Sequence, residues 1–233
     1  HGRRQIAPMT NRRPRGSIRS VRTWNGAALI AAAGLGLAGA TACEDEVQLV
    51  QDDQVCIEKA DGSFYCIDVY EAARIDASRT DQGTSDEGAV SLRGRLPWTN
   101  LEWADARAAC ERAGKRLCTV EEWEDACDGQ VGEGGNLYPY GDEVMDGVCV
   151  TELTQNDDPL PTGSRDGCVS DFGVYDLGGN VWEWVGTTLD DAQVIGGGVN
   201  SDLRHRCDRL QIGQPFGVTE EDELLGFRCC SDR

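Results

Sequence analysis

Apolar residues at helical spacing predict a first helix in the middle of the chain, from a capping box at Thr99–Glu102 to a stop at Gly114. In such a box the Thr99 hydroxyl accepts a bond from a free backbone amide, and the Glu102 side chain reaches back to the start of the helix. The apolar residues that fall on one face of this helix are Trp103, Ala106, Cys110 and Ala113.

A second capping box, Thr119 to Glu122, predicts a second helix close behind the first. Its apolar positions are Trp123, Ala126 and Cys127, and it should end before Gly129. Each predicted helix therefore turns one cysteine inward, where it could be joined to a distant segment.

Alternating apolar residues over Val55–Glu71, interrupted by Asp61-Gly62, predict a β-hairpin. Its loop length decides how two cysteines face each other. With a three-residue loop over 60–62, Cys56 lies directly opposite Cys66, whereas a two-residue loop would put them on opposite faces of the strands. A disulfide between Cys56 and Cys66 therefore requires the three-residue loop.

The rest of the chain predicts loops and short strands. Residues 76–94 are rich in Asp, Ser, Thr, Gly and Arg, which favours a long surface loop. After Gly129 no helical pattern exceeds three turns. The short strands expected there are Val174–Leu177, Val181–Val185, Gln193–Ile195 and Gly226–Cys230. Together these elements predict a loop-rich α+β domain with two helices and short irregular sheets.

The first 43 residues have the pattern of an export signal. They contain seven arginines and no acidic residue, then the small apolar run 27–42, which ends in an A-x-A box at 40–42. The run is too short and too rich in glycine for a good membrane span, and a buried helix is the alternative. Cys43 follows the box directly, so lipidation of Cys43 is predicted, with simple secretion as the alternative.

We therefore divide the chain into a signal peptide at 1–43, an acidic tether at 44–54 and one domain at 55–233. Without the seven arginines of the signal, 15 basic residues face 41 acidic ones, and the net charge becomes −26. Such a surface repels nucleic acid and anionic lipid, so no nucleic-acid partner is expected.

Ten cysteines remain after Cys43, and an even set in an exported protein predicts a disulfide framework. Metal binding is the rival interpretation. It is disfavoured because the chain has no C-x-x-C pair and keeps only His205 after signal removal, while zinc sites need clustered ligands.

The segment GGNVWEWV at 178–185 places Glu183 between two tryptophans and Asn180 after a double glycine. The tryptophans either enclose a functional carboxylate or are core residues around a carboxylate without a role. Five landmarks occur in order along the chain: Tyr70-Glu71; the run from Gly114 to Ala126; Tyr138–Glu143; GGNVWEWV; and Gly196–Gly198 with Gly226-Phe227-Arg228.

This ordered set resembles the sulfatase-modifying-factor, or formylglycine-generating-enzyme, domain over roughly residues 64–230. The resemblance implies the formylglycine-generating-enzyme-like variant of the C-type lectin fold, held by disulfides. Enzymes of this family resemble one another in holding copper(I) with two thiols five residues apart, a ligand type that suits this soft ion. Here Cys207 stands at the second position but Asp202 at the first, so copper is not expected and Cys207 remains only a weak catalytic candidate.

The resemblance also bears on other metals. A branch of the superfamily binds non-haem iron through three histidines, and His205 alone does not supply them. Family members hold calcium near the GNVWEW loop, which makes Asn180 and Glu183 the candidate calcium ligands; the alternative is a turn cap and a buried hydrogen bond. Further acids in the same half of the chain are Asp142, Asp146, Asp171 and Asp176.

Finally, the resemblance implies disulfide pairings, which we treat as hypotheses. The family pairs its helix cysteine with the cysteine after GFR, here Cys110 with Cys229. The other implied bridges are Cys127–Cys207, Cys149–Cys168 and, for the two cysteines left, Cys118–Cys230.

Three functions follow as hypotheses. The preferred one is an exported, lipid-anchored, calcium-stabilised binding or structural module at the cell envelope, with an unknown protein or glycan ligand and a membrane contact through the lipid on Cys43. The second is a formylglycine-generating-type oxidase, or another protein-modifying enzyme, that uses Cys207 as its sole thiol. The third is an inert structural lipoprotein.

Overall fold

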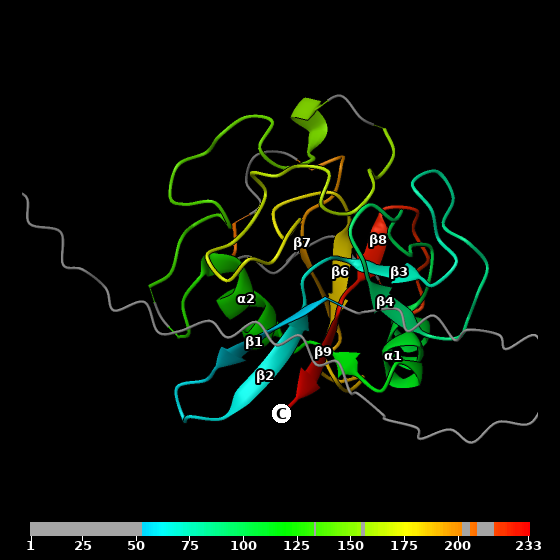
Figure 1. Ribbon diagram of the computed structural model, residues 1–233, viewed down its shortest axis with the longest axis horizontal. Coiled ribbons are helices and arrows are strands. Elements are labelled where there is room, and N and C mark those ends of the chain that lie inside the picture. Colours follow the sequence, from blue (N-terminus) through cyan, green and yellow to red (C-terminus); the bar gives the residue numbers. More distant parts are fainter. Residues whose placement is uncertain (1–52, 133, 155–156, 202–205, 209–216) are drawn as a thin grey trace, which may run out of the picture.

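The computed structural model describes residues 53–132, 134–154, 157–201, 206–208 and 217–233 (Figure 1). The predicted signal peptide with Cys43, nearly all of the acidic tether, Asp202 and His205 lie outside these residues.

The first described element is the predicted hairpin. Strand β1 (Gln54–Glu58) pairs antiparallel with β2 (Phe64–Asp68), and Cys56 lies opposite Cys66. The loop holds three residues, 60–62, and Gly62 has a φ of 85°, which glycine adopts without steric cost. The three-residue loop is confirmed, and Cys56 and Cys66 form a disulfide.

Three small sheets build the β part of the domain. The first has the order β1-β2-β9-β5, the second pairs β3 with β4, and the third has the order β7-β6-β8, with β6 and β8 parallel. The bounds of the further strands are β3 Ala72–Arg74, β4 Ala89–Ser91, β5 Arg116–Leu117, β6 Trp182–Val185, β7 Gln193–Gly196, β8 Leu225–Phe227 and β9 Cys229–Asp232. A single 3-10 turn covers Glu152–Thr154.

Helix α2 (Val120–Asp128) has the predicted start and end. The Thr119 hydroxyl accepts from the Glu122 amide, the Glu122 carboxylate accepts from the Thr119 amide, and Gly129 ends the helix in the left-handed conformation. Helix α1 (Trp103–Arg112) exists, but its predicted capping box is wrong. Residue Glu102 is the N-cap and makes no side-chain cap. The Thr99 hydroxyl instead accepts a hydrogen bond from Gln82.

Two strand predictions and one loop prediction need correction. Residues 174–177 form no strand; only an isolated bridge joins Tyr175 to Val169, and Asp176 has a left-handed φ of 66°. The predicted loop 76–94 contains β4. The predicted strand 226–230 is two strands in two different sheets, with Arg228 between them.

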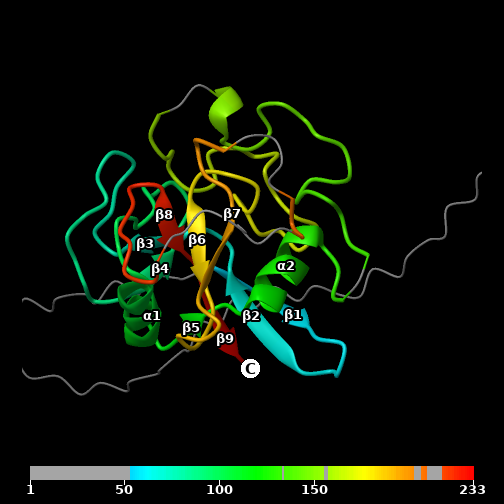
Figure 2. The ribbon, with the colours of Figure 1, turned by 180° about the vertical axis from the view of Figure 1, so that it is seen from behind.

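The two helices lie on opposite sides of the central strands, and the loop-rich segments gather at one end of the molecule (Figures 1 and 2). Trp103 of α1 packs in one buried cluster with Trp184 and Phe227, and Trp123 of α2 packs in another with Tyr65 and Ile195. The α+β prediction is confirmed. Within the described residues, no helix has the length and apolar character needed to cross a membrane.

Candidate functional site

The break between β8 and β9 turns Arg228 into the interior, where it meets Glu183 of β6. Arg228 Nε and Nη2 each donate to one oxygen of the Glu183 carboxylate at 2.7 Å. Trp123 Nε1 of α2 donates to Glu183 Oε2, also at 2.7 Å. None of these three side chains is more than 1% exposed. The ion pair is therefore bidentate and removed from water, the geometry in which a charged hydrogen bond is strongest.

The rest of the Arg228 guanidinium binds backbone carbonyls. Nη1 donates to the Asp68 carbonyl at 3.1 Å, and Nη2 donates to the Tyr175 carbonyl at 2.9 Å. One side chain thus joins β2, the loop at 175 and β6. Because β2 is far in sequence from the other two segments, Arg228 organises the centre of the domain.

Asn180 lies beside this ion pair and is fixed by the loop at Leu160. Its Oδ1 accepts from the Leu160 amide at 2.8 Å, and its Nδ2 donates to the Leu160 carbonyl at 3.0 Å and to Glu71 Oε2 at 2.6 Å. The other oxygen of Glu71 accepts from the Val181 amide at 3.2 Å. Burial raises the pKa of Glu71 well above its usual range, and nearby Asp176 raises it further.

These contacts do not fit the calcium site expected at Asn180 and Glu183. A calcium ion needs six to eight oxygen ligands. Both oxygens of Glu183 accept from Arg228, and Asn180 Oδ1 accepts from a backbone amide. A cation at Glu183 would also face the Arg228 guanidinium. In this arrangement Asn180 and Glu183 have the roles named above as the alternative to calcium binding. Asn180 fixes a turn, and Glu183 is a buried carboxylate held by hydrogen bonds.

The further acids named from the sequence do not converge on one point. Asp142, Asp146 and Asp171 are exposed, and Asp176 is buried. Asp142 accepts from the Leu137 amide, and Asp171 accepts from the Asn136 side chain. Among the described residues, no group of three or more His, Cys, Asp or Glu side chains is placed to hold a metal ion.

Asp176 is the third acid of the buried cluster. Its Oδ2 accepts from the Gly163 amide at 2.6 Å, and the residue is 2% exposed. Burial raises its pKa from 3.8 to about 6. The folded state therefore holds a proton on Asp176 at pH values where the unfolded chain has lost it.

This pKa predicts a pH-dependent effect of Asp176→Asn. The protonated carboxyl of Asp176 makes its full contribution to the free energy of unfolding below pH 3.8. This contribution is lost as the pH rises through about 6. Asparagine keeps the acceptor for Gly163, tolerates the left-handed backbone and carries no charge. The variant should gain about 1 to 3 kcal/mol over the parent at pH 7.5, measured by urea unfolding.

At pH 4 the same comparison should show a much smaller gain, because the parent is then largely protonated at Asp176. Asp166→Asn is a matched control, since its carboxylate is exposed and pairs with Arg93. A gain for Asp176→Asn that is equal at both pH values would contradict the prediction.

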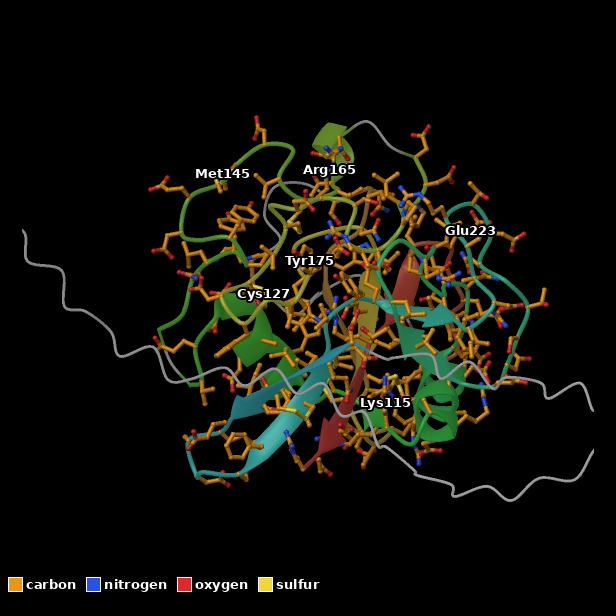
Figure 3. All side chains as sticks on the ribbon, in the orientation of Figure 1. Lys115, Cys127, Met145, Arg165, Tyr175 and Glu223 are labelled. Carbon is orange, nitrogen blue, oxygen red and sulfur yellow. A yellow bond between two sulfur atoms is a disulfide. The ribbon has the colours of Figure 1, made fainter. Side chains whose placement is uncertain are left out.

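Cys207 is bridged to Cys127 of α2, and each cysteine is 1% exposed (Figure 3 labels Cys127). The weak catalytic candidate is therefore a buried half of a disulfide. The remaining bridges join Cys110 to Cys229, Cys118 to Cys230 and Cys149 to Cys168. These are the pairings that the family resemblance implies.

Sequence reasoning missed the roles of Glu71, Arg228 and the Trp123 indole. All three stand in the landmark motifs, so their positions were noticed but not their contacts. For the two charged residues the signal was a polar group inside an apolar run: Glu71 precedes two alanines, and Arg228 lies between Phe227 and Cys229.

Comparison with known proteins places these features in context. A family model described as "Sulfatase-modifying factor enzyme 1-like domain" matches residues 50–233. The chain is 34% identical over 158 residues to the inactive C-alpha-formylglycine-generating enzyme 2 of Bos taurus, covering 58% of this chain and 50% of that protein. It is 30% identical over 182 residues to the formylglycine-generating enzyme of Streptomyces coelicolor, covering 63% of this chain and 57% of that protein. The chain thus spans about half the length of these curated relatives.

Two solved structures share the architecture. Treponema denticola variable protein 1 superimposes with a TM-score of 0.54 at 13% identity, over 73% of this chain and 85% of that one. CarF gives a TM-score of 0.52 at 17% identity, over 73% and 87%. At these identities the likeness shows the fold alone, which is the C-type lectin-like α+β fold.

Proposed function

Because the chain belongs to the sulfatase-modifying factor family, we propose that it is a member without thiol-oxidase activity that serves as an exported binding or structural module. The observation that carries this proposal is the Cys127–Cys207 bridge. Cys207 is the only cysteine at the two positions of the family's copper ligands, and it is bonded to Cys127 in a buried disulfide.

Loss of oxidase chemistry follows from the ligands that remain. Copper(I) favours soft thiolates. Asp202 offers a hard carboxylate at the first position, and Cys207 offers no thiolate while it is bridged. The family includes a bovine relative whose name marks it as inactive, which supports the same assignment.

Export is supported by the cysteine pairing. All ten cysteines after Cys43 are joined in five bridges, and disulfides form and persist in oxidising compartments. The signal pattern at 1–43 leads to the same conclusion. We propose that Cys43 carries a lipid that holds the domain at the cell envelope, with the acidic tether between lipid and fold.

The test of this proposal is a combined thiol and activity assay on the purified protein. We expect thiol titration in denaturant without reductant to detect none of the ten domain cysteines. We further expect no stoichiometric copper(I) uptake and no aldehyde formation on a sulfatase-type cysteine peptide, read by mass spectrometry. The Streptomyces coelicolor enzyme is the positive control. Copper(I) uptake together with aldehyde formation would overturn the proposal.

A further inference from the structure

The β1–β2 hairpin carries one disulfide, Cys56–Cys66, on the side that faces away from the core. Side chains alternate along β2: Tyr65 and Ile67 pack in the buried cluster with residues of α2, so Phe64 and Cys66 point to the opposite side. Phe64 is 42% exposed there. The hairpin lies at the edge of the molecule in both views, beside the end of β9 (Figures 1 and 2).

This bridge is more accessible to solvent than the other four. Cys56 is half-buried, and Cys66 is 6% exposed. The eight cysteines of the other bridges are each at most 4% exposed. A thiol in solution therefore reaches Cys56 in the folded domain, whereas it reaches the other bridges only after the surrounding core opens. Accessible disulfides are the ones that exchange most readily with thiols.

Opening this bridge leaves the hairpin paired. The Lys59 amide donates to the Ser63 carbonyl at 2.8 Å, so these two residues form a hydrogen-bonded pair, three positions from the cysteine pair in the register. Because hydrogen-bonded and non-hydrogen-bonded pairs alternate in an antiparallel ladder, Cys56 and Cys66 form a non-hydrogen-bonded pair. The backbone hydrogen bonds of the hairpin therefore lie on either side of the disulfide and do not depend on it.

Other contacts hold the hairpin to the domain. Lys59 Nζ pairs with Glu122 of α2 at 2.8 Å, and the Tyr65 hydroxyl donates to the Glu122 carbonyl at 2.9 Å. On its other edge β2 pairs with β9. The two cysteines are 10 residues apart, the shortest separation of the five bridges, so this bridge constrains the unfolded chain least. The domain therefore tolerates the loss of this bridge without unfolding.

A cationic side chain lies next to the accessible sulfur. Arg233 Nη1 donates to Cys56 Sγ at 3.6 Å. A guanidinium beside a sulfur stabilises the negative charge of a thiolate. Arg233 therefore favours both the attack of an incoming thiolate on Cys56 and the later departure of Cys56 as a thiolate.

We propose that Cys56–Cys66 is a thiol–disulfide exchange site, which a partner protein with two thiols opens while the other four bridges stay closed. Phe64, exposed on the same side of the hairpin, gives this partner an apolar contact. The site is separate from Cys207, and the proposal does not depend on the absence of oxidase activity.

The exchange proceeds in two steps. A thiolate of the partner attacks Cys56 Sγ, the Cys56–Cys66 bond breaks, and Cys66 leaves as a thiolate that takes up a proton. The partner's second thiolate then attacks the partner's own sulfur in the mixed disulfide, and Cys56 leaves as a thiolate beside Arg233. The partner is oxidised to a disulfide, and its two electrons reduce the bridge to two thiols. The protons released by the partner's thiols pass through solvent to the two cysteines.

The test is limited reduction of the folded, oxidised protein by dithiothreitol or by reduced thioredoxin. Differential alkylation and peptide mass spectrometry give the fraction of each cysteine that has opened. We expect Cys56 and Cys66 to be labelled together, about tenfold or more faster than Cys149 and Cys168, whose buried bridge has the next shortest separation. A thioredoxin with serine in place of its second cysteine should be trapped on Cys56 and not on Cys66.

Matched variants separate the partner contact from the thiol chemistry. Phe64→Ser should slow opening by thioredoxin about fivefold and leave the rate with dithiothreitol unchanged, because only the protein contacts this side chain. Arg233→Gln should slow opening by both reagents about threefold. Arg112→Gln is the control and should react as the parent does, since Arg112 is an exposed arginine on α1, away from the hairpin (Figures 1 and 2). Each variant replaces an exposed side chain and should unfold at the parent's temperature.

Earlier opening of another bridge, equal rates at all five bridges, or trapping of the serine-substituted thioredoxin on another cysteine would refute the exchange site. Thioredoxin rates that are unchanged in both Phe64→Ser and Arg233→Gln would refute it as well. These outcomes are distinguishable from failure of the proposed function, because opening of the bridge and aldehyde formation are measured independently.

Discussion

Replacing Arg228 with methionine is expected to lower the free energy of unfolding by about 3 to 5 kcal/mol. The substitution leaves the Glu183 carboxylate buried with the Trp123 indole as its one remaining side-chain donor among those described above. It also removes the donors to the Asp68 and Tyr175 carbonyls. Methionine fills much of the volume, so the loss reports the unpaired charge more than a cavity. Urea unfolding at pH 7 measures it.

A double-mutant cycle with Glu183→Met provides the control. Removing both charges takes away the carboxylate that Arg228 pairs with directly, so the double variant should be about 2 kcal/mol more stable than Arg228→Met alone. Should the double variant lose the sum of the two single losses, the ion pair would contribute no coupling and the central role assigned to Arg228 would be wrong.

Sequence patterns correctly predicted the elements that are stabilised by contacts between residues close in sequence. The cap of α2 is made within four residues, Thr119 to Glu122, and the hairpin register is set by its own loop. The capping-box prediction failed for α1 because the Thr99 hydroxyl accepts a hydrogen bond from a competing donor, Gln82, seventeen residues earlier. The apolar residues Val174 and Leu177 favour a strand over 174–177, and both are buried, but they reach the core from a loop in which Asp176 has a left-handed φ.

Only part of the arrangement at the centre of the domain could be predicted from the sequence. The flanking tryptophans marked Glu183 as unusual, but its partner Arg228 lies 45 residues later. Calcium and an arginine both satisfy a buried carboxylate, and residue types alone do not distinguish them. In the structure Glu183 pairs with Arg228, because the switch of strands between two sheets aims Arg228 at Glu183.

The second large effect is expected from two neighbouring disulfides, Cys110–Cys229 and Cys118–Cys230, which both end in β9. Replacing all four cysteines with alanine should lower the free energy of unfolding by about 6 kcal/mol, because no bridge then closes the loops of 119 and 112 residues. The same change at Cys149 and Cys168, 19 residues apart, should lower it by about 3 kcal/mol. In the loop-entropy account, the longer loop gains more freedom in the unfolded chain when its bridge is removed. Guanidinium unfolding of the parent and the two variants measures the difference.

The comparison is informative because all three bridges are buried, so each removal leaves a similar cavity. Replacing Cys110 and Cys229 alone is the control, because the Cys118–Cys230 bridge then still ties β9 to the segment before α2. That remaining bridge leaves only a short loop for Cys110–Cys229 to close, so the loss from this pair alone should be about 3 kcal/mol or less. A loss from the single pair as large as the loss from both pairs would contradict the prediction.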